Sequence, residues 1–250
     1  MHAYIAGQVP VSAVHWPGKV AFTMLFAGNN FRHAFSHAAF ADFRAEYLAE
    51  TRDLGKALEQ HRHAVEGVVF AGGEPCLQKP ALLELSRLAK RHQLPAALMT
   101  NGTKPEVIAA LLQEKLIAQV MLRVPAPLEE TAFEKITRSA TFFLPSAQVI
   151  ADIRKSIAEM QKHDVPVDVH TTIVPGILYR KEDVLDIAAA IAPLRCRWVL
   201  KQFVPDPNLL DRKLENISPP TMKFLETLRE AVQREHPQLV VELEENSILC

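Results

Sequence analysis

The chain has 250 residues and a formal charge of −1, with 28 Lys and Arg against 29 Asp and Glu. This balance gives no electrostatic reason to expect nucleic acid or an anionic membrane as the main partner. Apolar residues make up 48% of the chain and charged residues 23%, and this composition excludes wholesale disorder.

No apolar run approaches the ~18 residues of a membrane helix, and the first residues lack the basic and apolar regions of a signal peptide. The three cysteines, Cys76, Cys196 and Cys250, are too far apart in sequence for a disulfide framework or a thiolate metal site. We therefore expect a cytoplasmic protein.

Short apolar runs alternate with longer segments of helical periodicity along the whole chain. Six such pairs indicate a parallel sheet covered by helices, either a doubly wound sheet or a complete or partial barrel. Ligands of such folds bind at the carboxyl ends of the strands. The segment 205–220 is predicted to be a surface connection. In chain order the expected elements are strand 20–27, helix 41–63, strand 68–70, helix 80–92, strand 96–100, helix 105–115, strand 119–124, helix 147–163, strand 167–174, helix 182–191, strand 198–204, helix 221–234 and strand 239–243.

Glycines and polar residues gather where the predicted strands end. The second strand is followed by Gly72-Gly73-Glu74-Pro75, and the third by Thr100-Asn101-Gly102. Glycine lets the backbone approach a ligand without a Cβ in the way, and carbonyl oxygens beside a carboxylate can accept hydrogen bonds from an ammonium group. On the residues alone, an ordinary strand–helix connection explains this turn equally well.

The Gly-Gly-Glu-Pro turn resembles a signature of the radical SAM superfamily, where it holds the amino group of S-adenosylmethionine. The surrounding chain is similar to the activating enzymes of anaerobic ribonucleotide reductase and, more distantly, of pyruvate formate-lyase. This resemblance implies an α/β fold, a partial (β/α)6 barrel of mostly parallel strands, formed by residues 1–250 as one radical-SAM-like domain. The matching motifs are WPGKVA at 16–21, FAGGEPCLQ at 70–78, TNGTKPE at 100–106, APL at 126–128, TTIVPG at 171–176 and LKQF at 200–203.

The loop after the first predicted strand departs from that family. In the family it reads Gly-Cys-Asn-x-Arg-Cys-x-x-Cys-His, and its three thiolates hold irons of a [4Fe–4S] cluster whose fourth iron binds the cofactor. Residues 28–37 read Gly-Asn-Asn-Phe-Arg-His-Ala-Phe-Ser-His, so the cysteine positions fall on Asn29, His33 and Ser36. Amide and hydroxyl groups are poor cluster ligands. We therefore expect no conventional [4Fe–4S] cluster and no ordinary radical chemistry.

Other positions near the expected site also differ from the family. Met99, Arg123 and His15 stand where acidic residues are common, and His170 stands where a basic residue precedes Thr-Thr. The turn and packing motifs are still present, as expected for a protein that has kept the fold of the family and lost its original reaction. The resemblance implies that a remaining S-adenosylmethionine site would be formed by Gly72, Gly73, Glu74, Pro75, Thr100, Asn101, Arg123 and His170.

Two pairs of side chains offer further chemistry. His33 and His37 are four residues apart, so on a helical turn they would share a face and offer two imidazoles to a single metal ion. Glu74 and Arg123 both follow strands, where they would form an ion pair across a vacated pocket or bind the amino and carboxylate groups of a ligand.

Three functions remain open on this basis. The first is a degenerate radical-SAM-like protein that keeps a small-ligand site, for S-adenosylmethionine or a nucleoside, or acts as partner to an active enzyme. The second is a non-radical or metal-dependent enzyme that uses His33, His37, Glu74 and Arg123. The third is a radical SAM activating enzyme with unusual cluster ligation. The expected partner is a small molecule or another protein, and neither nucleic acid nor membrane.

Overall fold

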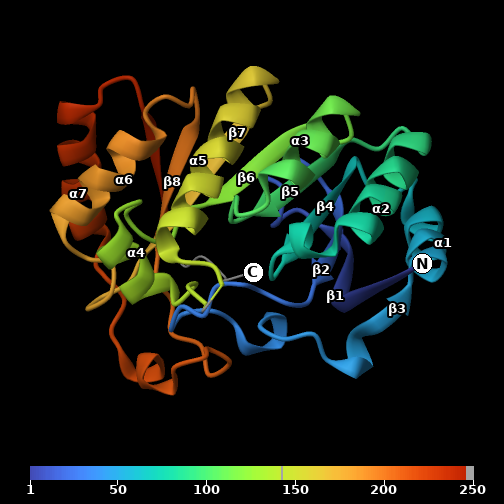
Figure 1. Cartoon of the computed structure of the whole chain (residues 1–250), viewed down its shortest axis with the longest axis horizontal. Coiled ribbons are helices and arrows are strands. Elements are labelled where there is room, and N and C mark those ends of the chain that lie inside the picture. The colour runs from blue at the N-terminus through green and yellow to red at the C-terminus, as the bar shows by residue number, and fades with distance from the viewer. Residues whose placement is uncertain (142, 246–250) are drawn as a thin grey trace.

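The computed structural model describes residues 1–141 and 143–245, which form an α/β fold around one open sheet (Figure 1). Within these residues the sheet has nine strands in the order β3-β1-β2-β4-β5-β6-β7-β8-β9. From β2 to β9 all neighbours pair in parallel, whereas β1 is antiparallel to β2 and β3. The sheet does not close, which confirms the predicted partial barrel. The strands are β1 His2–Ser12, β2 Ala21–Phe26, β3 Leu48–Glu50, β4 Gly67–Gly72, β5 Ala96–Thr100, β6 Gln119–Arg123, β7 Val167–Ile173, β8 Arg197–Gln202 and β9 Val240–Glu244.

Helices connect the parallel strands, and α2, α3, α5 and α6 lie along the same side of the sheet (Figure 1). Proline stands in the first turn of α2 and α3, where its missing N–H removes no helical hydrogen bond. The Thr221 hydroxyl caps α7 by accepting from Phe224 N. In the described part of the chain, no helix is both long and apolar enough to cross a bilayer. The helices are α1 Thr51–His61, α2 Lys79–Arg91, α3 Pro105–Gln113, α4 Glu130–Thr137, α5 Ser146–Lys162, α6 Lys181–Ile191 and α7 Met222–Glu235.

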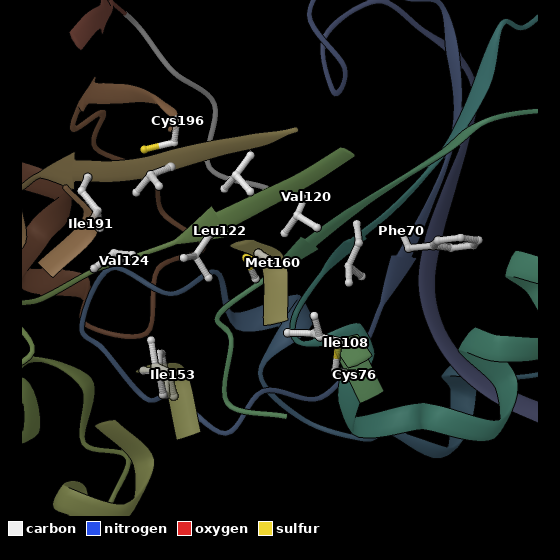
Figure 2. Close-up of a cluster of buried hydrophobic side chains, with 14 of the residues drawn as sticks. Phe70, Cys76, Ile108, Val120, Leu122, Val124, Ile153, Met160, Ile191 and Cys196 are labelled. Atoms are coloured by element: carbon white, nitrogen blue, oxygen red, sulfur yellow. The ribbon is translucent and has the colours of Figure 1, made fainter. Parts of the chain in front are cut away.

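The sheet has an apolar core on each of its two faces. Successive side chains of a strand point to opposite faces, so Val120 and Leu122 of β6 belong to the large core shared with the helices (Figure 2). The opposite face carries a smaller cluster that includes Ala97, Met99 and Met121. Met99 and Met121 stand near the carboxyl ends of β5 and β6. They therefore form the apolar floor beneath the polar residues described below.

The helix predicted over 41–63 is wrong in its first half. The α-helix covers only Thr51–His61, and a short 3-10 turn, Ala45–Tyr47, and strand β3 precede it. Leu48 of β3 pairs with Tyr4 of β1. Hydrogen bonding to the edge of the sheet therefore outweighs the helical spacing of apolar residues in this segment.

Strand β1 has no counterpart in the sequence prediction. Its apolar residues are interrupted by Gly7 and Pro10, which hide the alternation typical of a strand. The pairing of β1 with β2 is irregular between Val9 and Ser12, beside Pro10. Helix α4 was not predicted either, because eight residues carry too little periodicity to recognise.

The segment 205–220 runs over the surface, as the sequence predicts, with most of its residues exposed or half-buried, but it is anchored at a few points. It contains the 3-10 helix Arg212–Asn216, and Leu209 and Leu214 are only 3% and 4% exposed. Ala38 N donates to the carbonyl oxygen of Asn208 at 2.7 Å, which joins the segment to the loop after β2. The segment thereby supports that loop from outside.

Candidate functional site

A cavity of about 140 Å3 lies where the parallel strands end, next to Met99 and Met121. This is the edge at which open and closed α/β sheets bind ligands. Strands β6, β7 and β8 contribute Arg123, His170 and Lys201 to its wall, because alternate residues of each strand face the same side. The loop after β2 contributes Asn29, Phe31, His33, Phe35, Ser36 and His37.

The turn after β4 lies tightly against the loop after β2. Gly72 has a φ of +97°, and a Cβ on Gly73 would lie 2.2 Å from the carbonyl oxygen of Gly28. Glu74 N donates to the same Gly28 oxygen at 2.8 Å. The backbone path itself thus requires both glycines of the turn, independently of any ligand.

Glu74 is fully buried and holds the turn together. Its carboxylate accepts hydrogen bonds from Thr100 Oγ1 at 2.7 Å, Asn101 N at 2.6 Å and Cys76 N at 3.1 Å. The bond to Cys76 also caps the short 3-10 helix that Pro75 begins. Most of the bonding capacity of this buried carboxylate is therefore used by the protein, which is the usual condition for a buried charge.

Arg123 reaches from the end of β6 into this turn. Its Nη1 donates to the carbonyl oxygen of Gly72 at 2.8 Å, and its Nη2 donates to the carbonyl oxygen of Gly73. Nη2 also lies 4.0 Å from Glu74 Oε2, so the guanidinium lies close to the buried carboxylate. The predicted ion pair therefore forms, and the guanidinium is bonded to the carbonyl groups of Gly72 and Gly73 as well.

Histidines and cations face one another across the cavity. Burial, followed by the charges of Lys201, Arg197 and Arg123, lowers the pKa of His170 to about 3. Burial, followed by Lys201, also lowers the pKa of His15. The His170 Nε2 atom is buried and has no hydrogen-bond partner among the described residues. Both histidines are thus neutral in a region of positive potential.

The loop after β2 is closed by hydrogen bonds between its own side chains and backbone. Asn29 Oδ1 accepts from Phe31 N at 2.9 Å, and Ser36 Oγ is bonded to His33 Nδ1 at 2.8 Å. Burial and then Arg123 lower the pKa of His33 to about 3. His37 Nδ1 accepts from Ala39 N at 3.2 Å, so one of its two nitrogens caps a backbone turn.

No described residues form an obvious metal centre. Across residues 1–141 and 143–245, no three His, Cys, Asp or Glu side chains come together as a metal ion would require. Cys76 and Cys196 are buried free thiols. Burial, followed by the charge of Glu74, raises the pKa of Cys76 well above its usual range, and burial raises the pKa of Cys196 to about 12. Cys250 lies outside the described residues.

The residues singled out in the sequence do come together, in two layers. Gly72, Asn101, Arg123 and His170 line the cavity, whereas Glu74 and Thr100 lie behind the wall and fix its shape. Reasoning from the sequence missed Glu244, which lies 3.4 Å from Lys201 at the end of β9. The rule that ligand sites lie at carboxyl ends would have identified Glu244, since it directly follows the predicted strand 239–243.

Comparisons with known families agree with this fold. The family model described as radical SAM superfamily matches residues 31–191, which is more than half of the chain. A protein of Methanocaldococcus jannaschii named "Putative glycyl-radical enzyme activating enzyme" is 27% identical over 246 residues, covering 96% of both chains.

Solved structures resemble the chain in fold at low identity. A radical SAM methyltransferase from Sphaerobacter thermophilus has a TM-score of 0.69 at 13% identity, covering 94% of this chain and 68% of its own. SuiB of Streptococcus suis, solved with S-adenosylmethionine, has a TM-score of 0.66 at 13% identity, covering 86% and 48%. A domain of a pyruvate-formate lyase-activating enzyme from Bacteroides vulgatus has a TM-score of 0.51 at 13% identity, covering 71% and 98%.

Proposed function

Because this chain belongs to the radical SAM superfamily and is homologous to an activating enzyme, we propose that it is a cluster-free member that binds a small molecule at the barrel mouth. In this proposal the fold and the turn after β4 are kept, and reductive cleavage of S-adenosylmethionine is lost. The function of the protein then depends on binding this small molecule.

The donor set of the loop after β2 carries this proposal. Asn29, His33 and Ser36 occupy the positions that the resemblance assigns to the three cysteines, and a cluster iron requires thiolates or, less often, imidazoles. The one imidazole among them, His33, already shares its Nδ1 with Ser36 Oγ. These residues do not fit an iron–sulfur cluster, so no step of the proposed function depends on one.

The buried cysteines support the same conclusion. Thiolates, not thiols, bind iron, and the pKa values of Cys76 and Cys196 are raised by burial. Cys76 Sγ also lies 3.6 Å from Thr100 Oγ1, packed behind the Glu74 carboxylate. Neither thiol is therefore suited to replace a missing cluster ligand.

Iron and acid-labile sulfide content tests the proposal directly. We expect neither in stoichiometric amount when the native protein is purified without oxygen. A matched variant, Asn29→Cys/His33→Cys/Ser36→Cys, should gain both after reconstitution if these are the family's ligand positions. Stoichiometric iron with matching sulfide in the unchanged protein would overturn the proposal and favour an activating enzyme with unusual ligation.

S-adenosylmethionine and nucleosides are the first ligands to test, because SuiB, which has a similar fold, has been solved with S-adenosylmethionine. The polar wall of Asn101, Arg123 and His170 over the Met99 and Met121 floor is typical of small-molecule pockets. A ligand that binds the native state raises the melting temperature. No shift with any of these compounds would exclude this choice of ligand.

A second function is favoured by the likeness to the Methanocaldococcus jannaschii protein, which extends over 96% of the chain. A family member without a cluster can act as partner to an active enzyme of the same family. In that case the purified chain should bind such an enzyme and change its activity. Absence of both effects would exclude this role.

A further inference from the structure

We infer that Arg123 fills the place that the turn after β4 offers to a ligand ammonium group, so that the cavity accepts small organic anions without an ammonium group. This inference rests on the proposed function, because it names the class of ligand for the same cavity, and it ranks small anions above the ammonium-bearing S-adenosylmethionine among the compounds to be tested there. It makes Arg123 the residue that determines specificity.

The turn provides a cation-binding place of definite size. Two carbonyl oxygens, from Gly72 and Gly73, point toward Arg123, and the buried Glu74 carboxylate lies behind them. An ammonium group has three N–H donors and no acceptor, so these oxygens are its natural partners. A guanidinium offers the same charge and a rigid fork of donors that matches two adjacent carbonyls.

Arg123 occupies this place as part of the sheet. It is the last residue of β6 and pairs in register with His170 of β7, while its side chain crosses to the turn after β4. Its guanidinium is also close to the carboxylate of Glu74, which has 0% exposure. A ligand ammonium would have to displace this partly buried guanidinium from its two carbonyl acceptors and from the buried Glu74 carboxylate behind them, which is costly.

The remaining wall favours negative charge. Lys201 faces the cavity from β8, and its 3.4 Å ion pair is with Glu244, whose carboxylate is 43% exposed and therefore screened by water. His170 presents a buried Nε2 atom without a partner among the described residues. A carboxylate or phosphate oxygen would give this nitrogen an acceptor and would lie between two cations.

The pKa shifts agree with this geometry. After burial, the charges that lower the pKa of His170 are Lys201, Arg197 and Arg123, and no carboxylate opposes them. Lys201 likewise lowers the pKa of His15. The potential at both imidazoles is therefore positive, and a bound anion would be attracted there.

The ligand body is expected to be compact and apolar. The cavity measures about 140 Å3, below the ~300–1,000 Å3 of pockets that enclose drug-sized ligands. Met99, Met121 and Phe31 provide its apolar surface. A short thioether or aromatic acid fits this description better than a zwitterionic amino acid.

A pair of ligands that differ only in the ammonium group provides the test. Isothermal titration calorimetry of the full chain at neutral pH should give at least about tenfold tighter binding of methylthiobutanoate, which is methionine without its amino group, than of methionine. Adenosine monophosphate against adenosine tests whether phosphate serves as the anionic group. Methionine or S-adenosylmethionine binding as tightly as methylthiobutanoate, or no binding of either methylthiobutanoate or adenosine monophosphate, would overturn the inference.

Four variants separate specificity from folding. Arg123→Gln should reverse the preference toward methionine, because the turn regains a place for an ammonium group, whereas Arg123→Lys should retain the preference for anions. Lys201→Met should weaken anion binding about tenfold while the Arg123 contacts remain. Arg180→Ala removes an exposed arginine paired with Asp183, away from the cavity, and should change nothing.

The same samples distinguish this inference from the proposed function. Iron and sulfide in the protein would refute the cluster-free proposal whatever the ligand preference. A cluster-free protein that shows no preference for anions over their ammonium analogues would refute this inference alone.

Discussion

Glu74 illustrates how one buried carboxylate determines the local structure of the site. It is fully buried, and it accepts three hydrogen bonds from Thr100, Asn101 and Cys76 while lying 4.0 Å from Arg123. Removal of one partner from such a group leaves the others unpaired in a poorly solvated place. The residue therefore matters for folding as well as for ligand choice.

We predict that Glu74→Gln lowers the free energy of unfolding by about 3 kcal/mol, because an amide N–H would face Asn101 N and Arg123 would lose its counter-charge. Urea unfolding measures this loss. The matched control is Glu114→Gln, which breaks an exposed bidentate pair with Arg87 and should cost much less, because water screens that pair. Equal losses in the two variants would contradict the prediction.

His170 makes the stability of the fold depend on pH. Its pKa is about 3 in the folded protein against an ordinary 6.5, because of burial and the nearby charges of Lys201, Arg197 and Arg123. Below about pH 6.5 the His170 imidazole binds a proton in the unfolded chain, whereas in the folded chain it stays neutral down to about pH 3. Stability from this residue is thus complete above that pH and falls as the pH is lowered.

The expected loss at pH 5 is about 2 kcal/mol, from about 1.4 kcal/mol per pKa unit. His170→Gln should remove this part of the pH dependence, whereas the same change at the exposed His63 should not. Urea unfolding at pH 7.5 and pH 5 measures both. A slope that His170→Gln leaves unchanged would refute the assignment.

The residues of the site were largely predictable, but their contacts were not. The position of Gly72, Gly73, Glu74 and Arg123 at strand ends follows from alternating apolar runs and helices. Whether Arg123 pairs with Glu74 alone or enters the turn depends on how far its side chain must cross from β6 to β4. That distance is set by the order and twist of the strands, which local patterns do not encode.

At the scale of elements, the turn after β4 and the loop after β2 behave as one unit. A Cβ on Gly73 would lie 2.2 Å from the Gly28 oxygen and 2.7 Å from the Phe40 oxygen. Both of these atoms belong to the backbone and cannot move aside as a side-chain end can. The position of the candidate site therefore depends on a close contact between two main-chain segments.

Gly73→Ala should lower the free energy of unfolding by about 2–3 kcal/mol, because the turn must move away from the loop. The matched control is Gly7→Ala in β1, where the added methyl would meet only Leu25 Cδ1 at 3.6 Å. That change should be within about 0.5 kcal/mol of neutral. Thermal unfolding of both variants measures these changes. A Gly73→Ala variant as stable as the unchanged protein would show that the turn tolerates displacement.

Elements that pack on the helical side of the sheet were predicted well, because period and capping signals agree there. The predicted and observed ranges of α2, α5 and α7 differ by only one residue at each end. The segment 41–50 was wrong because its structure comes from pairing with β1, a contact distant in sequence. Propensity cannot anticipate a partner strand that is itself unrecognised.

At the scale of the whole molecule, polar contacts tie the open sheet together at the end opposite the cavity. Trp16 Nε1 donates to Gln119 Oε1 at 2.7 Å, and Gln119 Nε2 donates to Asp168 Oδ2 at 2.6 Å. Arg197 then joins Asp168 at 2.6 Å to Glu242 at 3.0 Å. The chain of contacts links β6, β7, β8 and β9, so it replaces some of the restraint that a closed barrel would have.

Asp168 is the centre of that chain, and its removal tests whether stability and ligand binding are separate. Asp168→Ala leaves Arg197 and Gln119 without their shared acceptor, and we expect a loss of about 2 kcal/mol in urea unfolding, since Arg197 is partly exposed. The ratio of methylthiobutanoate to methionine affinity should stay unchanged, because Arg123 and Lys201 stand at the other end of the strands. A changed ratio would mean that the amino ends of the strands control the cavity as well as the fold.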